Sequence, residues 1–415
     1  MRRVVITGMG VVSPIALGRE KYWRLLEEGQ NGVDRISLFD TKDYSVKIAA
    51  EVRDFDPEKW MDRKDARRAD RVIQFSVAAS DMAVEDASLD VDNLDPDRFG
   101  VFIGSGEGGI STSYEGMKTL LEKGPSRVGP FCVPMMLSNM PAAYVAIRFG
   151  AKGPNICVVT ACASATHTMG EAFHTIARDD ADIILTGGAE AAITEVAVAG
   201  FAAMKALSTR NEDPSHASRP FDVDRDGFVM GEGAGVLVFE ELEHARRRGA
   251  KIFGEVRGFG STCDAYHITA PDPDGSGAAK AMLQAVKKAG WSLCDVDLIN
   301  AHGTSTSLND RMESAAIRSA FGDAADLILV NSTKSMIGHT LGAAGALETI
   351  AAIQSLEESV VHPTRNCFNP DPECPINVVP DGKSLKREIS RLIVNNFGFG
   401  GHNAVVAIEK FKEKE

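Results

Sequence analysis

Three segments of the sequence place a reactive side chain after an apolar run. Cys162 follows the β-forming run 156–159 and is surrounded by small residues in "TACASAT". His302 comes after "VDLI" and His339 after "LILV", each among glycine, serine and threonine. Functional residues of α/β sheets collect where strands end and helices begin, so we expect these side chains at strand ends. A thiol at the start of a helix is favoured as the thiolate.

A cysteine and two histidines are compatible with several kinds of chemistry. One histidine could act as general base for a cysteine nucleophile, as in a protease-like pair. Two imidazole N–H groups could instead stabilise an oxyanion or enolate, with fixed positive charge from Lys334. Metal binding is the third option, but no His-x-x-x-His or Cys-x-x-Cys spacing supports it, so we expect no metal. A packed core cysteine and structural histidines are the alternative for each residue alone.

The elements that must position these residues are apolar runs separated by helical stretches. Continuous apolar runs indicate a sheet that is buried on both faces. Helical spacing predicts helices over 163–178, 277–289 and 342–356, and the alternation predicts a layered α/β fold. Similar halves predict a duplication, with a first domain over 1–250 and a second over 251–415. The runs are 4–10, 101–109, 156–164, 183–190, 235–241, 253–260, 296–306, 327–339, 376–380 and 392–410.

The composition is typical of a soluble globular protein. The 415 residues are 44% hydrophobic and 25% charged. No apolar run approaches the roughly 20 residues of a membrane helix, and "MRRVVITGMG" lacks the core of a signal peptide. A net charge of −13 argues against bulk nucleic-acid binding. Seven cysteines without a C-x-x-C motif predict a reducing cytoplasm rather than a disulfide scaffold.

Two glycine-rich segments are open to interpretation. "GSGEGG" (104–109) fits G-x-G-x-x-G, but this is a weak signal for a nicotinamide dinucleotide because "ISTSYEGMKTL" is a poor Rossmann helix. In "NNFGFGGHN", Phe397 and Phe399 between glycines suggest a mobile apolar gate or a backbone N–H donor site. A simple hairpin turn is the alternative for the second segment.

One basic cluster stands out in an acidic chain. Lys64, Arg67, Arg68 and Arg71 follow the spacing i, i+3, i+4, i+7, which predicts one shared helical face. Such a face would attract an acidic partner. A solvated surface is the alternative.

Five motifs in order resemble those of the β-ketoacyl-[acyl-carrier-protein] synthases, most closely the synthase II type of bacterial fatty-acid synthesis. They are "TACASATHT", "NAHGTST", "NSTKSMIGH", "LGAAGALE" and "NNFGFGGHN". The likeness runs from "VVITGMGVVSP" to the final strand and includes 206–235. It implies a thiolase-like fold with duplicated halves in a five-layered α-β-α-β-α arrangement, usually as a homodimer.

The resemblance also implies roles for individual residues. Cys162 would accept an acyl group from acyl carrier protein as a thioester, and His302 and His339 would promote decarboxylation of malonyl-carrier protein. The resulting carbanion would attack acyl-Cys162, giving CO2 and a 3-oxoacyl product longer by two carbons. The N–H groups of Cys162 and Phe399 would form the oxyanion hole, and Phe399 would gate the acyl channel.

Other implied residues act around this centre. Lys334 and Glu348 would support the histidines, and Thr304 and Thr306 would contact the phosphopantetheine arm. The candidates for docking the carrier protein are Lys64, Arg67, Arg68, Arg127 and Lys205. No organic cofactor is implied, because phosphopantetheine arrives on the carrier protein; a structural monovalent cation is left open.

Two positions depart from the family pattern. Glu107 stands where relatives usually carry an apolar residue lining the acyl pocket. A buried carboxylate is costly unless it is paired or protonated, so the preferred chain length and unsaturation are not predicted. Asn396 replaces a common serine, and we expect little effect from it.

Three related functions compete with a fatty-acid condensing enzyme. The first is a polyketide-type ketosynthase, which the motifs alone do not separate from it. A thiolase is less favoured, because no cysteine follows Cys374 to act as a second base. A non-catalytic partner subunit is disfavoured by the intact Cys162, His302 and His339.

Overall fold

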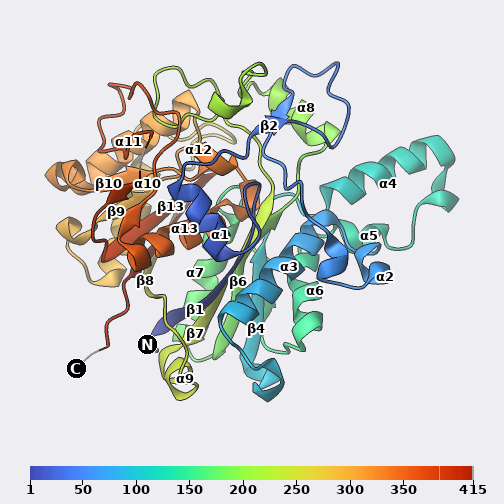
Figure 1. Cartoon of the computed structure of the whole chain (residues 1–415), viewed down its shortest axis with the longest axis horizontal. Helices are drawn as coiled ribbons and strands as arrows, with labels where there is room; N and C mark the ends of the chain where they lie inside the picture. Colours follow the sequence, from blue (N-terminus) through green and yellow to red (C-terminus); the bar gives the residue numbers. More distant parts are fainter. Residues whose placement is uncertain (383, 414–415) are drawn as a thin grey trace.

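The computed structural model of the chain describes residues 1–382 and 384–413 (Figure 1). Ten strands form one hydrogen-bonded sheet in the order β10-β9-β13-β14-β8-β1-β7-β6-β4-β5. Numbered within its own half, each set of five strands has the order 3-2-4-5-1, so the predicted duplication is present as a repeated topology. The strands are β1 (Val4–Val12), β4 (Phe99–Gly104), β5 (Asn155–Ile156), β6 (Ile183–Glu190), β7 (Gly233–Glu241), β8 (Gly254–Cys263), β9 (Leu298–Asn300), β10 (Leu329–Asn331), β13 (Arg391–Gly398) and β14 (His402–Glu409).

Two short strand pairs and the α-helices lie outside this sheet. Two short antiparallel pairs join β2 (Asp34–Arg35) to β3 (Ile48–Ala49) and β11 (Val360–Val361) to β12 (Leu385–Lys386). The α-helices are α1 (Arg19–Glu27), α2 (Arg63–Ala66), α3 (Arg71–Asp86), α4 (Ile110–Lys123), α5 (Cys132–Met136), α6 (Met140–Phe149), α7 (Ser164–Ala177), α8 (Glu195–Ala203), α9 (Leu242–Arg247), α10 (Ser276–Ala289), α11 (Ser307–Phe321), α12 (Lys334–Ile337) and α13 (Ala344–Glu358).

The helices form three layers around the two halves of the sheet (Figure 1). The outer layer of the first half is α3 with α6, which pack on β1, β7, β6 and β4. The outer layer of the second half is α10, which packs on β8 and β14, with α11 beside it. Between the halves, α7 and α13 contact strands of both. The result is the expected α-β-α-β-α arrangement, in which Val4–Ile6 of β1 pair with Gly254–Val256 of β8 and join the halves.

The central helix α13 shows why this sequence forms a middle layer. Every residue from Ala344 to Leu356 is buried, and most of them are small or apolar. A helix that is apolar all round must be covered on all sides, as α13 is by strands of both halves. Neither α13 nor any other helix in the described ranges is long and apolar enough to cross a membrane.

Several predicted boundaries differ from the structure. The helices expected at 163–178, 277–289 and 342–356 are present as α7, α10 and α13. The expected strand over 156–164 is reduced to the two residues of β5, because the chain then turns toward α7. The run 376–380 forms no strand and contributes only a bridge between Val378 and Val330. The run 392–410 is a hairpin, with Gly400 and Gly401 at φ +87° and +77° in its turn.

The predicted basic face is wrong. α2 ends at Ala66, and Asp70 starts a new helix by accepting a 3.2 Å hydrogen bond from the Val72 amide. Arg71 therefore lies in α3 and turns inward, where its guanidinium is 2.6 Å from the carboxylate of buried Glu232. Lys64 and Arg67 remain exposed, so the four basic residues do not share one helical face.

Candidate active site

Cys162 lies on a tight turn between β5 and α7. Ala161 before it has φ +51°, a left-handed conformation that is uncommon for a residue with a side chain. The Ser164 hydroxyl accepts from the Thr160 amide (2.9 Å) and donates to the Ala161 carbonyl (2.7 Å). Gly398 of β13 packs against the turn, where a Cβ would lie 2.6 Å from the Thr160 oxygen. The thiol is therefore held on a strained corner, like a nucleophile elbow.

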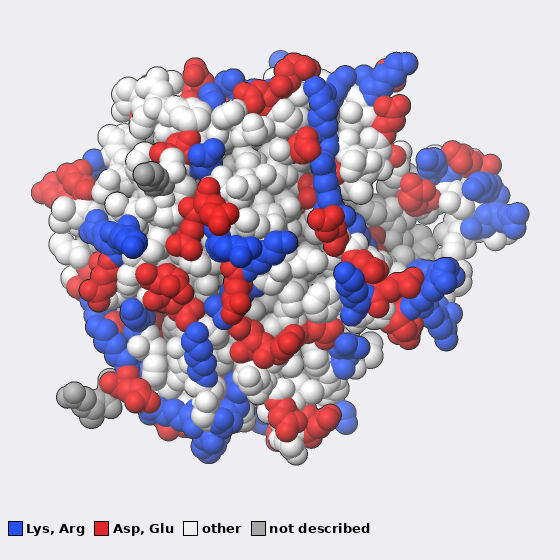
Figure 2. All heavy atoms as spheres, in the orientation of Figure 1, with Lys and Arg blue, Asp and Glu red and all other residues white. Residues whose placement is uncertain are grey.

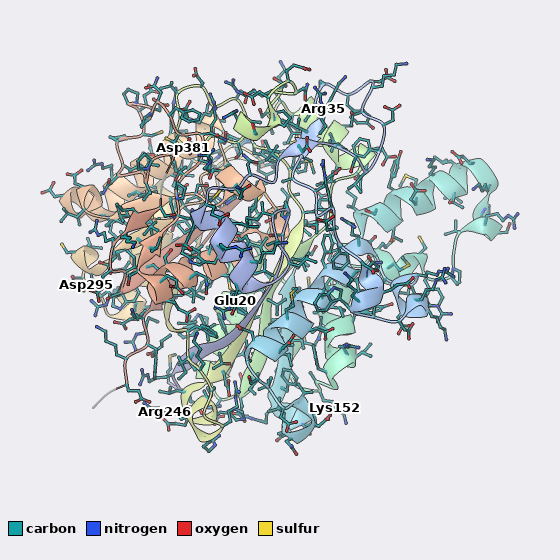
Figure 3. All side chains as sticks on the ribbon, in the orientation of Figure 1. Glu20, Arg35, Lys152, Arg246, Asp295 and Asp381 are labelled. Atoms are coloured by element: carbon teal, nitrogen blue, oxygen red, sulfur yellow. The ribbon has the colours of Figure 1, made fainter. Side chains whose placement is uncertain are left out.

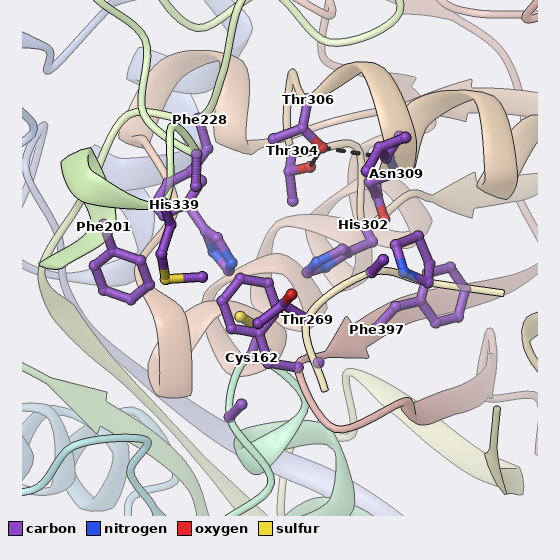
Figure 4. A pocket seen from close by; sticks show the side chains of 18 of the residues that line it. Cys162, Phe201, Phe228, Thr269, His302, Thr304, Thr306, Asn309, His339 and Phe397 are labelled. Atoms are coloured by element: carbon purple, nitrogen blue, oxygen red, sulfur yellow. Dashed lines mark hydrogen bonds between the residues drawn. The ribbon is translucent and has the colours of Figure 1, made fainter. Parts of the chain in front are cut away.

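His302 and His339 face Cys162 from the second half of the chain (Figure 4). The sulfur of Cys162 and one ring nitrogen of each histidine all lie within 4.8 Å of one another. The two imidazole centroids are 5.3 Å apart, with the rings at 85°. Three segments that are far apart in the sequence thus bring one thiol and two imidazoles to one point.

Backbone hydrogen bonds hold the His339 loop in place. The His339 amide donates to the Val229 carbonyl (2.7 Å), and the Gly231 amide donates to the His339 carbonyl (2.9 Å). The Leu341 amide donates to Nδ1 of His339 over 3.3 Å. Because Nδ1 accepts this hydrogen bond, the ring proton of neutral His339 lies on Nε2.

Glu313 on α11 holds His302, and the sequence analysis did not single it out. Its carboxylate accepts from the amides of His302 (2.9 Å) and Gly303 (2.8 Å) and from the Asn395 side chain (3.1 Å). Burial raises the pKa of Glu313 to about 7. A signal was present, because Glu313 falls in the apolar stripe of α11 beside Met312.

A cavity of about 450 Å³ opens over these groups. Thr304 and Thr306 lie on its wall, and their hydroxyls are 2.9 Å apart. Thr306 also caps α11 by accepting from the Asn309 amide (3.3 Å). Phe399 lines the cavity, and its ring packs 6.4 Å from that of Phe201 between centroids. The expected gate and threonines therefore border the space above Cys162.

Burial controls the ionisation of the thiol. It raises the pKa of Cys162 to about 12, against the opposing effects of Lys334 and of the N–H groups of Cys162 and Phe399, which point at the sulfur. The expected preference for a thiolate at the helix start is therefore not met in the resting state, because desolvation outweighs the charge of Lys334 and the two backbone N–H groups. The thiol must lose its proton when a substrate arrives.

Both imidazoles are neutral at physiological pH. Burial, with the positive charge of Lys334 as a second cause, holds the pKa of His302 and of His339 well below the usual range. Nδ1 of His302 is buried and has no hydrogen-bond partner among the described residues.

Lys334 is part of a buried chain of polar groups. Its ammonium contacts the carboxylate of Glu348, and both side chains are almost fully buried. The other carboxylate oxygen of Glu348 accepts from Asn396 (2.8 Å), whose carbonyl oxygen accepts from the hydroxyl of Thr166 on α7. The structure thus gives Asn396 a bridging position between the lysine pair and the helix after Cys162, which the expectation of little effect did not anticipate.

The loop "GSGEGG" does not form an open anion site. The amides of Gly106 (2.7 Å) and Glu107 (3.1 Å) donate to the buried carboxylate of Glu190. The amide of Gly108 donates to the Ser105 hydroxyl (3.0 Å), which itself donates to Glu190. Because these N–H groups already have partners, they are not free to bind a pyrophosphate. Glu190 is a second buried carboxylate that the sequence analysis did not single out.

The docking candidates lie in separate places. Lys205 is exposed and lines the cavity. Arg68 packs against the Phe131 ring at 4.5 Å, next to exposed Lys64 and Arg67, whereas Arg127 follows the end of α4. Figure 2 shows basic side chains over α2 and at the far end of α4, with acidic ones between them. One chain therefore does not gather the five candidates into one patch.

Among the described residues, one cluster has the spacing of metal ligands. It consists of Cys162, His302 and His339. The ammonium of Lys334 acts on all three of them and repels a cation. Its paired position beside Glu348 fits stabilisation of an anion better than binding of a metal.

Comparisons with known proteins agree with this geometry. The model of the β-ketoacyl synthase N-terminal domain matches residues 1–245, and that of the C-terminal domain matches residues 253–368. Proteins named 3-oxoacyl-[acyl-carrier-protein] synthase 2 from Synechocystis sp. and from Staphylococcus aureus are each 50% identical over 411 residues, covering 99% of both chains.

Solved structures show the same likeness. A β-ketoacyl synthase from Burkholderia phymatum is 36% identical, with a TM-score of 0.93 over 99% of this chain and 100% of that one. The ishigamide ketosynthase/chain length factor has the same identity, TM-score and coverage. A type II PKS acyl-carrier protein in complex with its ketosynthase (AntDE:AntF) matches at 33% identity and a TM-score of 0.91, covering 99% and 100%.

Proposed function

This chain belongs to the β-ketoacyl synthase family, and from that premise we propose that it is a 3-oxoacyl-[acyl-carrier-protein] synthase of fatty-acid elongation. It is a condensing acyltransferase that joins an enzyme-bound acyl group to malonyl-carrier protein. The observation that carries the proposal is the position of Cys162, His302 and His339, whose reactive atoms lie within 4.8 Å of one another on one cavity.

The first half-reaction loads the acyl group. The Cys162 thiol gives its proton to a neighbouring imidazole, and the sulfur attacks the thioester carbonyl of the acyl-carrier protein. The oxyanion that develops accepts hydrogen bonds from the N–H groups of Cys162 and Phe399, which already point at the sulfur. The carbon–sulfur bond to phosphopantetheine breaks, and the arm leaves as its thiol after taking up the proton.

The second half-reaction extends the chain. Malonyl-carrier protein loses CO2, and the electron pair of the broken carbon–carbon bond forms an enolate. The enolate oxygen accepts hydrogen bonds from the neutral imidazoles, including Nε2–H of His339. Its carbon attacks acyl-Cys162, and collapse of the second oxyanion releases a 3-oxoacyl thioester longer by two carbons and the cysteine thiolate. The thiolate takes up one proton from solvent and returns to the resting thiol.

The partners follow from this chemistry. Acyl carrier protein delivers both substrates, its phosphopantetheine passes Thr304 and Thr306, and Lys64, Arg67, Arg68, Arg127 and Lys205 receive its acidic surface. No organic cofactor or catalytic metal takes part in either half-reaction. A homodimer would let docking residues of two chains act together, since one chain places them apart. A polyketide role is less well supported, because the 50% identical relatives are named 3-oxoacyl-[acyl-carrier-protein] synthase 2, whereas the matched type II PKS ketosynthase is 33% identical.

The decisive experiment incubates the purified protein with octanoyl- and malonyl-carrier protein and analyses the products by mass spectrometry. We expect 3-oxodecanoyl-carrier protein and CO2 in equal amounts, and an octanoyl adduct on Cys162 when malonyl-carrier protein is omitted. Cys162→Ala should form neither product nor adduct, while Cys263→Ala, which changes an exposed thiol, should behave as the wild type. Elongation by Cys162→Ala would refute the proposal.

A further inference from the structure

Glu107 places a carboxyl group on the wall of the cavity that contains Cys162. It lines that cavity together with Gly106, Ala161, Phe201 and Leu341. The side chains around this end are otherwise apolar: Phe201, Leu341 and Ile110 pack with Cys162 in one cluster. Glu107 is therefore an acidic group in a wall that is suited to hydrocarbon.

No cation or hydrogen-bond donor among the described residues compensates this carboxyl group. Its backbone amide donates to Glu190, but its side chain makes no hydrogen bond or ion pair in the part of the chain that the structure describes. Glu190 behind it is already satisfied by the amides of Gly106, Glu107 and Gly342 and by the Ser105 hydroxyl. Glu190 is itself a carboxyl group, and its negative charge repels the Glu107 carboxylate. It therefore does not stabilise the ionised form of Glu107.

Glu107 and Cys162 line the same cavity, which has an exposed rim and a closed side. The rim lies at Thr306 and Leu308, since Leu308 is 65% exposed. On the side of Gly106 and Glu107 the cavity is closed by fully buried Glu190, which accepts hydrogen bonds from both of their amides. A thioester that enters past Thr306 and is transferred to Cys162 must extend its acyl group away from the rim, toward this wall.

We propose that Glu107 is a specificity-determining residue that biases acyl loading of Cys162 toward short chains. The inference rests on the proposed function and adds the acyl preference to it. A short acyl group ends before the carboxyl group and leaves it hydrated. A long saturated chain must cover it and remove its water, which a carboxylate resists strongly and a neutral carboxylic acid resists less.

The charge of Glu107 changes near neutral pH. Burial, followed by the neighbouring Glu190, raises the pKa of Glu107 to about 7. The other ionisable groups on the cavity wall are Cys162, His302, His339, Lys205, Asp226 and Asp264. Below pH 7 the neutral acid should admit long chains, and above pH 7 the carboxylate should exclude them.

The test measures loading of Cys162 from butyryl- and palmitoyl-carrier protein by intact mass, between pH 6 and 8.5. The readout is the ratio of the two second-order rates, in which the ionisation of Cys162 itself cancels. For the wild type we expect the long-to-short ratio to fall on the order of tenfold or more as pH rises, because the protonated fraction of a group with a pKa of about 7 falls by that much. Glu107→Gln should give a ratio that does not change with pH, and Glu107→Leu a higher ratio at every pH.

A control variant, Glu122→Gln, removes an exposed carboxylate from α4 and should follow the wild type. The inference is overturned if the wild type, Glu107→Gln and Glu107→Leu share one ratio at every pH. The pH dependence of the wild-type ratio tests the inference even if a variant does not fold. A long-to-short ratio that stays constant with pH in the wild type already excludes an effect of Glu107 titration. Failure of the proposed function looks different, because the wild type would then load neither thioester.

Discussion

At the scale of single residues, burial is the main influence on the protonation of Cys162 and of the two histidines beside it. Desolvation keeps the thiol protonated and both imidazoles neutral, and Lys334 supplies the positive charge that acts on all three. A neutral imidazole can donate a hydrogen bond to an enolate oxygen through its N–H group. Its other nitrogen can accept the proton that leaves the thiol. The pair of Lys334 with Glu348 keeps this charge in place without adding net charge to the interior.

The first prediction separates the roles of the cysteine and the histidines. His302→Ala and His339→Ala should each still carry an acyl group on Cys162, because the remaining imidazole can take the thiol proton and the oxyanion hole is made of backbone N–H groups. Each should slow malonyl decarboxylation by on the order of 10²–10³, the usual cost of one lost oxyanion donor. Intact mass measures loading, and CO2 release measures decarboxylation. His216→Ala, a change at a partly buried histidine that does not line the cavity, is the control. Decarboxylation at the wild-type rate in both active-site variants would contradict the assignment.

The second prediction concerns pH. Because the pKa of each histidine is lowered, both rings stay neutral as pH falls from 8 to 6, and protonation begins only at lower pH. The rate of CO2 release from a preloaded enzyme should therefore be flat over this range. An acidic decline with a midpoint near 6.5, the pKa of an unperturbed histidine, would show that the rings are not held neutral.

The positions of the three reactive residues were predictable from sequence, and their supports were not. Cys162, His302 and His339 each follow an apolar run, and such runs end at the functional edge of a sheet. Glu313 and Glu190 were missed because a single glutamate in a sequence is usually a surface residue. The backbone amides that donate hydrogen bonds to their carboxylates come together only in the fold. The ionisation of Cys162 was misjudged because local sequence shows a helix start but not the depth of burial.

At the scale of elements, the site depends on how the two halves meet. β13 brings Gly398 against the Cys162 turn, and the next residue supplies the second N–H group at the sulfur. Asn396, on the same strand, connects Glu348 of α13 to Thr166 of α7. β13 thus positions the second N–H donor of the oxyanion hole, and through Asn396 it also holds the carboxylate that pairs with Lys334. The layer order could be predicted from alternating runs, but the length of β5 could not, because its turn into the Cys162 loop depends on contacts with β13.

The third prediction tests the Asn396 bridge. Asn396→Ser shortens the side chain, so the carboxylate of Glu348 and the hydroxyl of Thr166 lose their shared partner in a fully buried site. We expect the free energy of unfolding to fall by about 1–3 kcal/mol, the cost of leaving buried polar groups unpaired. Denaturant unfolding at pH 7 measures it. Asn93→Ser, at an exposed position, should change stability by less than about 0.5 kcal/mol; equal effects of the two variants would remove the structural role of Asn396.

The fourth prediction tests docking of the carrier protein at α2. Lys64→Glu with Arg67→Glu reverses two exposed charges, leaving Arg68 in place because it packs on Phe131. The KM for acyl-carrier protein should rise several-fold, whereas the KM for a small acyl thioester should not change, since the cavity is untouched. Reversal of Arg246 and Arg247 on α9, where Arg246 lies at another end of the molecule (Figure 3), is the matched control. An equal rise for both substrates would remove the docking role.

At the scale of the whole molecule, one edge of the described sheet is open and has large exposed apolar side chains beside it. β5 forms the edge of the sheet beyond β4, and its two residues are exposed. Beside it, α4, α5 and α6 pack on one another and present Leu121, Val133 and Ile147 to solvent, with Leu121 81% and Ile147 78% exposed. Large exposed apolar side chains beside an open sheet edge are typical of an interface. This surface, which we call the β5 side, is where we expect the second chain of a homodimer.

The last prediction tests that interface. Ile147→Asp with Val133→Asp places two charges on the β5 side, at positions that are exposed in one chain and would be desolvated between two. The wild type should elute as a dimer of about twice 44.4 kDa in size-exclusion chromatography with light scattering, and the variant as a monomer at micromolar concentration. Leu327→Asp, at an exposed apolar residue outside the β5 side, should remain dimeric. If the variant elutes as the dimeric wild type does, the interface lies elsewhere, and a monomeric wild type would rule out the dimer. Because the monomeric variant keeps the Cys162 cavity, its acyl loading would also show whether one chain suffices for that step.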